Sequence, residues 1–232
     1  MRLRIASWNM HAGVGLDGRF APGRIAHVLG ELDADLVALQ EFGSRRDFDM
    51  LAHLEQAAAA RGIAMPTFSR HGCDFGNVVL SRLEVLSSAC IDLACDRREP
   101  RNAVDLVVDA GGHALRVVAT HLGLRRTERC EQLARIAAAL HGAKAPAVVL
   151  LGDFNDWRTA VPAALSGLFE PSRAPPTFPS PYPVAALDRI WIAPADVLVA
   201  LEPHRSRTAR VASDHLPLVA TLRWPPEYEA DP

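Results

Sequence analysis

The sequence predicts an α/β protein built as a four-layer α/β/β/α sandwich, with two mixed β-sheets packed face to face and helices outside. Three observations support this fold class. Short apolar runs rich in β-branched residues recur along the chain, amphipathic helical patterns separate several of them, and the order strand, helix, strand occurs twice. Two such units, each a sheet with helices on one face, would bury their free sheet faces against each other.

The predicted strands are the apolar runs of this pattern. In chain order they are LRIASW, DLVALQ, NVVLS, AVDLVVDA, ALRVVATH, AVVLLG, ALDRIWI and LPLVATLRW. Their β-branched content and their length of five to nine residues are typical of strands.

Three helices are predicted between these strands. Residues 21–34 carry apolar side chains at helical spacing, with Pro22 near the start, where a missing N–H costs nothing. Residues 126–142 repeat this spacing and end at Gly142, and the Leu- and Ala-rich segment 48–61 is the third. A further helix is expected to begin near Trp157, with Asn155 or Asp156 as its cap.

Length and composition favour one domain. The 232 residues, 49% of them hydrophobic, suffice for a single large core, so we expect one domain over residues 1–224 and a flexible acidic tail over residues 225–232. Segment 171–183 holds six prolines and is predicted as a loop. The four cysteines lack the paired spacing of a zinc site, and no signal core or apolar membrane span is recognisable, so the cytoplasm is the expected location.

Polar side chains follow or interrupt the predicted strands. They are Asn9, Glu41, His121, Asp153, Asn155, Asp188, Asp214 and His215. Each has a structural alternative when taken alone, such as a helix cap, a turn or a hydrogen-bonded core histidine. Asp188 is the hardest to explain in this way, because a carboxylate among apolar neighbours must find a partner.

Together these residues predict a cation site. Parallel strands end on the same side of their sheet, so both halves would present their polar ends at one rim. Several carboxylates a few ångströms apart repel one another unless a cation lies between them. Oxygen ligands with little sulfur favour Mg²⁺ or Mn²⁺.

Seven short motifs occur in order along nearly the whole chain: WNMHA, LQE, GNVVLSR, THL, GDFN, LDRIW and SDHLP. This ordered set resembles the endonuclease/exonuclease/phosphatase family. The resemblance implies the four-layer sandwich and hydrolysis of phosphoester bonds with a divalent metal.

By matching position, the resemblance also implies residue roles. Glu41 would be the principal metal ligand, with Asn9 beside it and Asp214 from the other half of the chain. Asp153 would orient or deprotonate the attacking water. The remaining roles fall to four residues. Asn155 would help to hold the phosphate and the attacking water, His121 and His215 would donate to the phosphoryl oxygens, and Asp188 would fix the ring of His215.

The substrate is open between two classes of phosphoester. A nuclease acting on single-stranded or short nucleic acid is favoured by arginine clusters near residues 45, 98, 126 and 207, which would form a positive rim on a chain of net charge −2. Arg101 and Asn77 are the expected substrate-binding residues. The alternative is a sphingomyelinase-like phosphodiesterase, or a phosphatase of small molecules such as inositol phosphates. A membrane lipid partner is therefore not excluded, no protein partner can be inferred, and an inactive scaffold is the third hypothesis.

Overall fold

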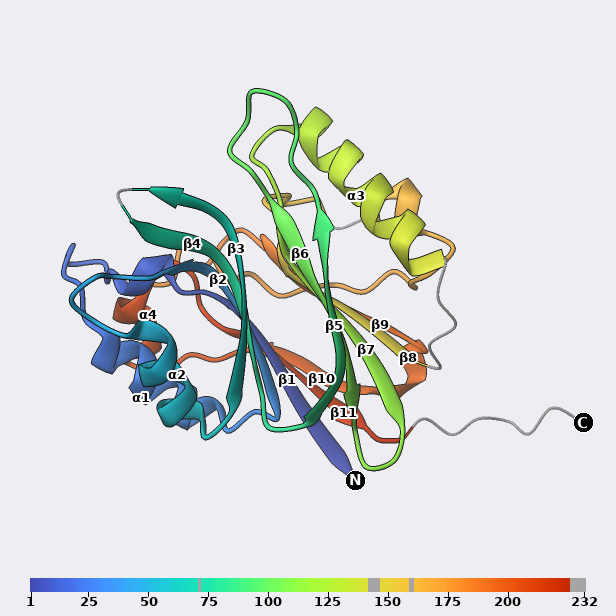
Figure 1. Ribbon diagram of the computed structural model, residues 1–232. Helices are drawn as coiled ribbons and strands as arrows, with labels where there is room; N and C mark the ends of the chain where they lie inside the picture. The colour runs from blue at the N-terminus through green and yellow to red at the C-terminus, as the bar shows by residue number, and fades with distance from the viewer. Residues whose placement is uncertain (71, 142–146, 159–160, 226–232) are drawn as a thin grey trace, which may run out of the picture.

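The computed structural model describes residues 1–70, 72–141, 147–158 and 161–225. They form two mixed β-sheets packed face to face (Figure 1). The first sheet has the strand order β10-β11-β1-β2-β4-β3, with β1 (Arg2–Asn9), β2 (Leu36–Gly43), β3 (Arg61–Arg70), β4 (Cys73–Ser81), β10 (Leu198–Pro203) and β11 (Leu218–Arg223). The second has the order β5-β6-β7-β8-β9, with β5 (Glu84–Asp92), β6 (Asn102–Asp109), β7 (Ala114–His121), β8 (Ala147–Asp153) and β9 (Asp188–Ala193).

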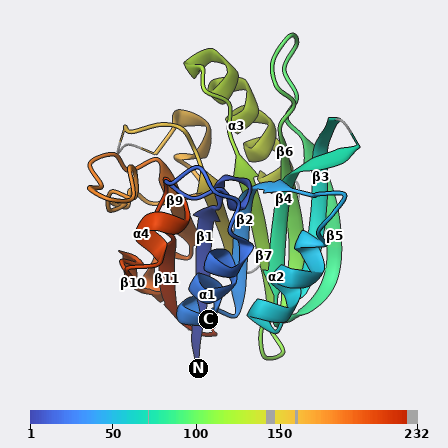
Figure 2. The ribbon, with the colours of Figure 1, turned by 90° about the vertical axis from the view of Figure 1, so that its left-hand side faces the viewer.

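Helices cover the outer face of each sheet, which confirms the predicted four-layer sandwich. In Figures 1 and 2, α1 (Pro22–Leu32), α2 (Met50–Ala58) and α4 (Ala209–Ala212) lie on the outer side of the first sheet, and α3 (Arg126–His141) lies on that of the second. The described part of the chain also contains three short 3-10 helices: His11–Gly13, Ala163–Leu165 and Ala195–Val197.

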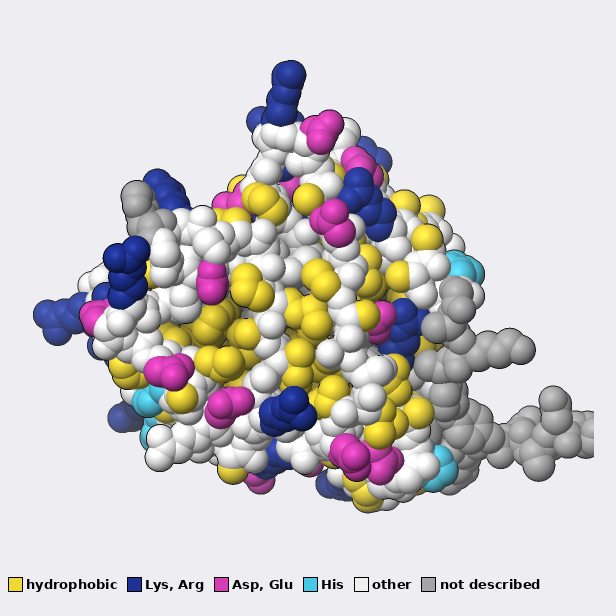
Figure 3. All heavy atoms as spheres, viewed as in Figure 1, with side chains coloured by type: hydrophobic (Ala, Val, Ile, Leu, Met, Phe, Trp, Pro, Cys, Tyr) yellow, Lys and Arg dark blue, Asp and Glu magenta, His cyan; other side chains and the backbone are white. Residues whose placement is uncertain are grey.

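Three apolar cores hold the layers together, one between the sheets and one under each set of helices. Alternation of side chains along each strand explains this division, since successive residues point to opposite faces. In β1, for example, Leu3 and Ile5 enter the core between the sheets, whereas Ala6 and Trp8 pack under the helices. Figure 3 shows hydrophobic side chains at the surface of the face on which β3 and β5 lie. Ile63 of β3 and Val85 of β5 are partly buried and pack against the core between the sheets.

The strands that sequence patterns miss are β3, β5 and β10, and each lies at the edge of a sheet. An edge strand is half exposed, so it lacks the continuous apolar run that identifies a buried strand. The predicted helix over residues 48–61 is shorter in the structure, because it ends at Ala58 and Arg61 already begins β3. The four-residue helix α4 also carries no recognisable pattern.

The expectation of a helix near Trp157 is wrong for the described residues. Residues 154–158 have no regular secondary structure, and the next described helix is the 3-10 turn at Ala163. Asn155 adopts a left-handed backbone conformation with φ 49°, which does not start a right-handed helix. Gly142 and residues 226–232 of the expected tail lie outside the described residues. Within the described part of the chain, no helix is both long and apolar enough to cross a membrane.

The strand directions bring the two halves of the site together. Strand β1 runs parallel to β2, and β7 runs parallel to β8, as the two strand, helix, strand units predict. The carboxyl ends of these four strands carry Asn9, Glu41, His121 and Asp153.

Candidate active site

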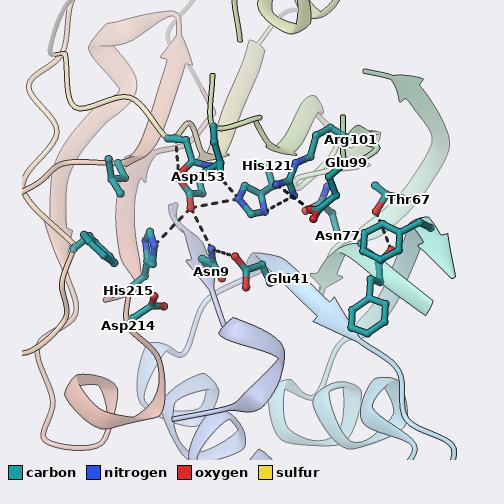
Figure 4. A pocket seen from close by; sticks show the side chains of 17 residues that line it. Asn9, Glu41, Thr67, Asn77, Glu99, Arg101, His121, Asp153, Asp214 and His215 are labelled. Carbon is teal, nitrogen blue, oxygen red and sulfur yellow. Dashed lines mark hydrogen bonds and ion pairs between the residues drawn. The ribbon is translucent and has the colours of Figure 1, made fainter. Parts of the chain in front are cut away.

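A cavity of about 480 Å³ opens at the carboxyl ends of these strands (Figure 4). Nine of the ten predicted site residues line it: Asn9, Glu41, Asn77, Arg101, His121, Asp153, Asn155, Asp214 and His215. The tenth, Asp188, lies directly behind His215. The structure therefore brings together residues that are up to 206 positions apart in the chain, from Asn9 to His215.

Asp153 lies at the centre of this cavity and is 1% exposed. Its Oδ2 lies 3.6 Å from Nε2 of His121 and 3.6 Å from Nε2 of His215, and it accepts a hydrogen bond of 3.2 Å from Asn9. Burial by itself would raise the pKa of Asp153, but the two histidines and the hydrogen-bond donors outweigh it and hold the pKa below its usual range. Asp153 is thus a buried carboxylate in its ionised form.

Gly152 allows β8 to place Asp153 there. Its φ is +146°, and a Cβ at this position would lie 1.9 Å from the backbone oxygen of Thr120 on the neighbouring strand β7. Only glycine permits this close approach of two backbones. The glycine of the GDFN motif is therefore a structural requirement of the site.

His215 is held between two buried carboxylates. Its Nδ1 lies 2.9 Å from Oδ2 of Asp188, which is fully buried and also accepts a hydrogen bond from Thr177. Burial opposes a positive charge on the ring, but the facing carboxylates, Asp188 foremost, outweigh it and raise the pKa of His215 to about 10. The ring is therefore an imidazolium at neutral pH, and its Nε2–H points toward Asp153.

His121 has the opposite electrostatic environment. Burial lowers the pKa of His121, and the nearby Arg101 guanidinium lowers it further, against the attraction of Asp153. Nη1 of Arg101 lies 3.2 Å from the ring Nδ1, and Nδ2 of Asn155 lies 3.1 Å from Nε2. A guanidinium can only donate, so the neutral ring accepts from Arg101 at Nδ1, while the Asn155 amide nitrogen donates at 2.8 Å to the carbonyl of Leu122. The remaining N–H is then on Nε2, the nitrogen that faces Asp153.

Glu41 and Asn9 form the part of the site that β1 and β2 supply. Asn9 donates its amide hydrogens to Oε1 of Glu41, at 2.9 Å, and to Asp153, while its Oδ1 accepts from the backbone N–H of His11. Glu41 has a left-handed backbone conformation with φ 54°, at an irregularity in the pairing of β2 with β4. Such strained positions in non-glycine residues concentrate at functional sites.

Asp214 and Asn77 also line the cavity. Asn77 belongs to β4, and Asp214 lies between α4 and β11. The Asp214 side chain is 35% exposed, and its Oδ1 lies 3.9 Å from Nδ1 of His11 and accepts from Ser213. The amide nitrogen of Asn77 already donates to Asn102, with its carbonyl as one acceptor and its side-chain oxygen as the other. Asn77 therefore has a structural partner in addition to its place in the cavity wall.

The donor set fits a hard divalent cation. Glu41, Asp153 and Asp214 bring three carboxylates to one cavity, in which Arg101 is the single arginine among the described lining residues. Ligand atoms of Asp153, Asp188 and His215 also lie within 4.8 Å of one another. Since Asp188 is already hydrogen-bonded to His215 and Thr177, that buried group is held together without an ion. The carboxylates of Glu41 and Asp214 are the more accessible oxygen ligands, and oxygen ligands suit Mg²⁺ or Mn²⁺.

Sequence patterns did not identify several residues of the site. Thr177 hydrogen-bonds Asp188 from inside the proline-rich loop. Glu99 pairs with Arg101 at 3.0 Å. Of the arginine clusters, Arg101 alone lines the cavity within the described residues, whereas Arg129 is buried beneath the loop that follows β7.

Comparison with known proteins identifies the family of this chain. The family model described as "Endonuclease/Exonuclease/phosphatase family" matches residues 6–215. The chain is 30% identical to the uncharacterized protein YbhP of Escherichia coli K12, over 94% of this chain and 95% of that protein. The protein therefore belongs to the endonuclease/exonuclease/phosphatase family, whose members hydrolyse phosphoesters.

Solved structures share the fold. An endonuclease/exonuclease/phosphatase from Beutenbergia cavernae superimposes with a TM-score of 0.77 at 24% identity, covering 96% of this chain and 71% of that one. Truncated TDP2 from Caenorhabditis elegans gives a TM-score of 0.69 at 21% identity, covering 96% and 98%. TDP2 from D. rerio, in complex with a single-strand DNA product, gives 0.69 at 20%, covering 96% and 99%. These likenesses confirm the predicted four-layer sandwich.

Proposed function

We propose that this protein hydrolyses phosphodiester bonds by attack of a metal-assisted water molecule. One observation carries the proposal: an ionised, buried Asp153 lies equally far from an imidazolium and a neutral imidazole, in a cavity that the carboxylates of Glu41 and Asp214 also line. This combination supplies a proton acceptor for water and N–H donors for phosphoryl oxygens.

Each residue around Asp153 has a separate role in the proposed reaction. Asp153 accepts a hydrogen bond from the water and, as that water attacks, its proton. His215 is charged and donates Nε2–H to an oxygen that becomes more negative in the transition state, and Asp188 holds the ring by accepting its Nδ1–H. His121 donates a second N–H, and Asn155 contributes its amide.

Glu41, Asn9 and Asp214 would hold Mg²⁺ or Mn²⁺. When bound, such an ion neutralises charge on the non-bridging phosphoryl oxygens and lowers the pKa of a coordinated water. The protein's contribution is the arrangement of the ligands: Asn9 ties Glu41 to Asp153, so the ligand set and the proposed base are fixed relative to one another.

Single-stranded or short nucleic acid is the first substrate class that we propose. Arg101 and Asn77 lie in the cavity wall and would contact the phosphate or its neighbour. Support comes from the D. rerio TDP2 structure, which contains a single-strand DNA product.

A phospholipid head group is the second candidate, because an apolar groove adjoins the cavity. The groove has a volume of about 760 Å³ and shares Asn155, Phe178 and Leu187 with the catalytic cavity. Its other walls include Trp157 and Val184. A substrate with an apolar portion next to its phosphodiester would fill both spaces.

A substrate screen tests the proposal. Single-stranded DNA, RNA, phospholipids and inositol phosphates are offered with Mg²⁺ or Mn²⁺ to the wild-type protein and to Asp153→Asn. We expect the wild type to release product from a phosphodiester and the variant to lose that activity. No turnover of any of these substrates by the wild type, with either metal, would contradict the proposed function.

A further inference from the structure

Four large apolar side chains project into solvent around the mouth of the site. They are Leu124, Trp157, Tyr182 and Val184, here called the apolar rim, with exposed fractions of 74%, 75%, 83% and 82%. Such residues are common singly on protein surfaces, but a group around one opening marks an interaction surface.

The rim is continuous with the catalytic cavity. Leu124 belongs to the cavity wall, whereas Trp157 and Val184 belong to the adjoining apolar groove. Tyr182 lies two residues before Val184, in a turn closed by a hydrogen bond of 3.1 Å from its N–H to the carbonyl of Pro179. The rim therefore draws on three loops, which follow β7, follow β8 and precede β9.

Two buried arginines hold these loops in place. Arg129 donates to the carbonyl of Leu124 at 2.6 Å. Arg189, which is 3% exposed, donates at 2.9 and 3.0 Å to the carbonyls of the residues on either side of Trp157. The loops thus use costly buried cations to fix their backbone, while their large apolar side chains remain outside the core. Such an arrangement suits a preformed docking surface, since it reduces the entropy lost on binding.

Positive charge accompanies the rim. Arg125 and Arg126 follow Leu124, and Arg173 belongs to the wall of the apolar groove. All three are exposed, and in the described ranges none has a carboxylate within 4.0 Å. Arg158, beside Trp157, is instead neutralised by Asp156. Three free cations next to four exposed apolar side chains complement a surface that is both anionic and apolar.

We propose that the apolar rim docks the mouth of this site onto an anionic phospholipid surface. Aromatic and aliphatic side chains flanked by arginines are the composition of interfacial membrane contacts. Two rim residues, Leu124 and Val184, are aliphatic and offer no ring for base stacking, which is the main apolar contact with single-stranded nucleic acid. Docking goes beyond the proposed hydrolysis and does not require it, but it would bring lipid head groups to the cavity.

Vesicle flotation tests the docking without any chemistry. Wild-type protein is mixed with vesicles of phosphatidylcholine alone or with added phosphatidylglycerol, and the floating fraction is measured. We expect binding to the anionic vesicles that falls about tenfold or more in the double variant Trp157→Ser/Val184→Ser, because its main apolar contacts are lost. Arg125→Gln/Arg126→Gln should weaken binding to the anionic vesicles and reduce its sensitivity to salt, since Arg173 alone remains of the three cations.

A matched double variant controls for general loss of surface apolarity. Leu86 and Val199 are 55% and 50% exposed on the edge strands β5 and β10, so Leu86→Ser/Val199→Ser should float like the wild type. Thermal unfolding verifies that all variants are folded.

The proposal is overturned if wild type does not float with anionic vesicles or if both apolar variants lose binding equally. It is also overturned if the rim variant loses binding to an oligothymidylate while vesicles bind neither protein. Hydrolysis of a soluble diester is measured separately, so failure of docking and failure of catalysis are distinguishable.

Discussion

Asp153 and Asp188 are directly paired residues on the antiparallel strands β8 and β9, and both carboxylates are buried. Paired residues in such strands project to the same face, so two carboxylates lie close together in the interior. The ring of His215 lies between them, with Nδ1 at 2.9 Å from Asp188 and Nε2 at 3.6 Å from Asp153. Because the strand pairing holds these two carboxylates close together, it favours a positive charge between them. His215 supplies that charge as an imidazolium.

Asp188→Asn should impair catalysis through His215. The amide cannot stabilise an imidazolium, so we expect the pKa of His215 to fall and kcat to drop by about 10²-fold. The pH–rate profile checks the mechanism, because its alkaline limb should move to lower pH. Asp196→Asn is the control, because Asp196 is an exposed carboxylate in the 3-10 helix Ala195–Val197. It should retain both the wild-type kcat and the wild-type pH–rate profile. An unshifted profile in Asp188→Asn would refute the coupling.

The raised pKa of His215 predicts a pH-dependent contribution to stability. In the folded state the pKa is about 10, against 6.5 for the free side chain, so protonation favours folding. This stabilisation is complete below pH 6.5 and declines as the pH rises toward 10. Urea unfolding of wild type and His215→Gln in EDTA should show a stability difference that narrows across this interval. A difference independent of pH would contradict the ion pair.

The sequence predicts the central layers and most of the site for one physical reason. Buried parallel strands have continuous apolar runs, and the polar residues at their ends must lie at one edge of the sandwich, as Asn9, Glu41 and Asp153 do. The left-handed bend at Glu41 was not predictable, because nothing in LQEFG marks an irregular pairing with β4. Thr177 was hidden for another reason: its contact with Asp188 depends on how a proline-rich loop folds over β9.

The arginine clusters show the limit of counting charges. Sequence proximity to the strand ends suggested a positive rim, yet Arg129 turns inward to bond the carbonyl of Leu124, and Arg210 bonds that of Pro181. An arginine carries five donors, so a loop with unpaired carbonyls can take it up as a structural brace. Which arginines do so depends on tertiary contacts that no local pattern encodes.

Glu41→Gln should weaken the dependence of activity on the metal. Loss of one carboxylate reduces the attraction for a divalent cation, so we expect the Mn²⁺ concentration for half-maximal activity to rise by about tenfold or more. Removal of metal with EDTA should abolish wild-type activity, and added Mg²⁺ or Mn²⁺ should restore it. Glu84→Gln, at an exposed carboxylate on β5, serves as the matched control. Activity that persists in EDTA would contradict the metal requirement.

Arg101→Gln should change the protonation of His121. Without the guanidinium beside Nδ1, one cause of the lowered pKa is removed, and the ring titrates at higher pH. We expect a rise in KM for a phosphodiester and an acidic limb of the kcat profile that moves to higher pH. Arg98→Gln, at an exposed position three residues earlier, should leave both unchanged. A rise in KM with an identical pH profile would limit Arg101 to substrate binding.

The most direct test of the central claim is hydrolysis of bis-p-nitrophenyl phosphate with Mn²⁺ by wild type, Asp153→Asn and Asp156→Asn. The two substitutions are matched, because each replaces a carboxylate by an amide and the two positions are only three residues apart. Asp156, however, faces Arg158 and Arg129 and does not line the catalytic cavity. If Asp153 accepts the proton of the attacking water, its variant should lose about 10²- to 10⁴-fold in kcat while Asp156→Asn remains active. A folded Asp153→Asn protein that hydrolyses the diester at the wild-type rate would contradict the proposed mechanism.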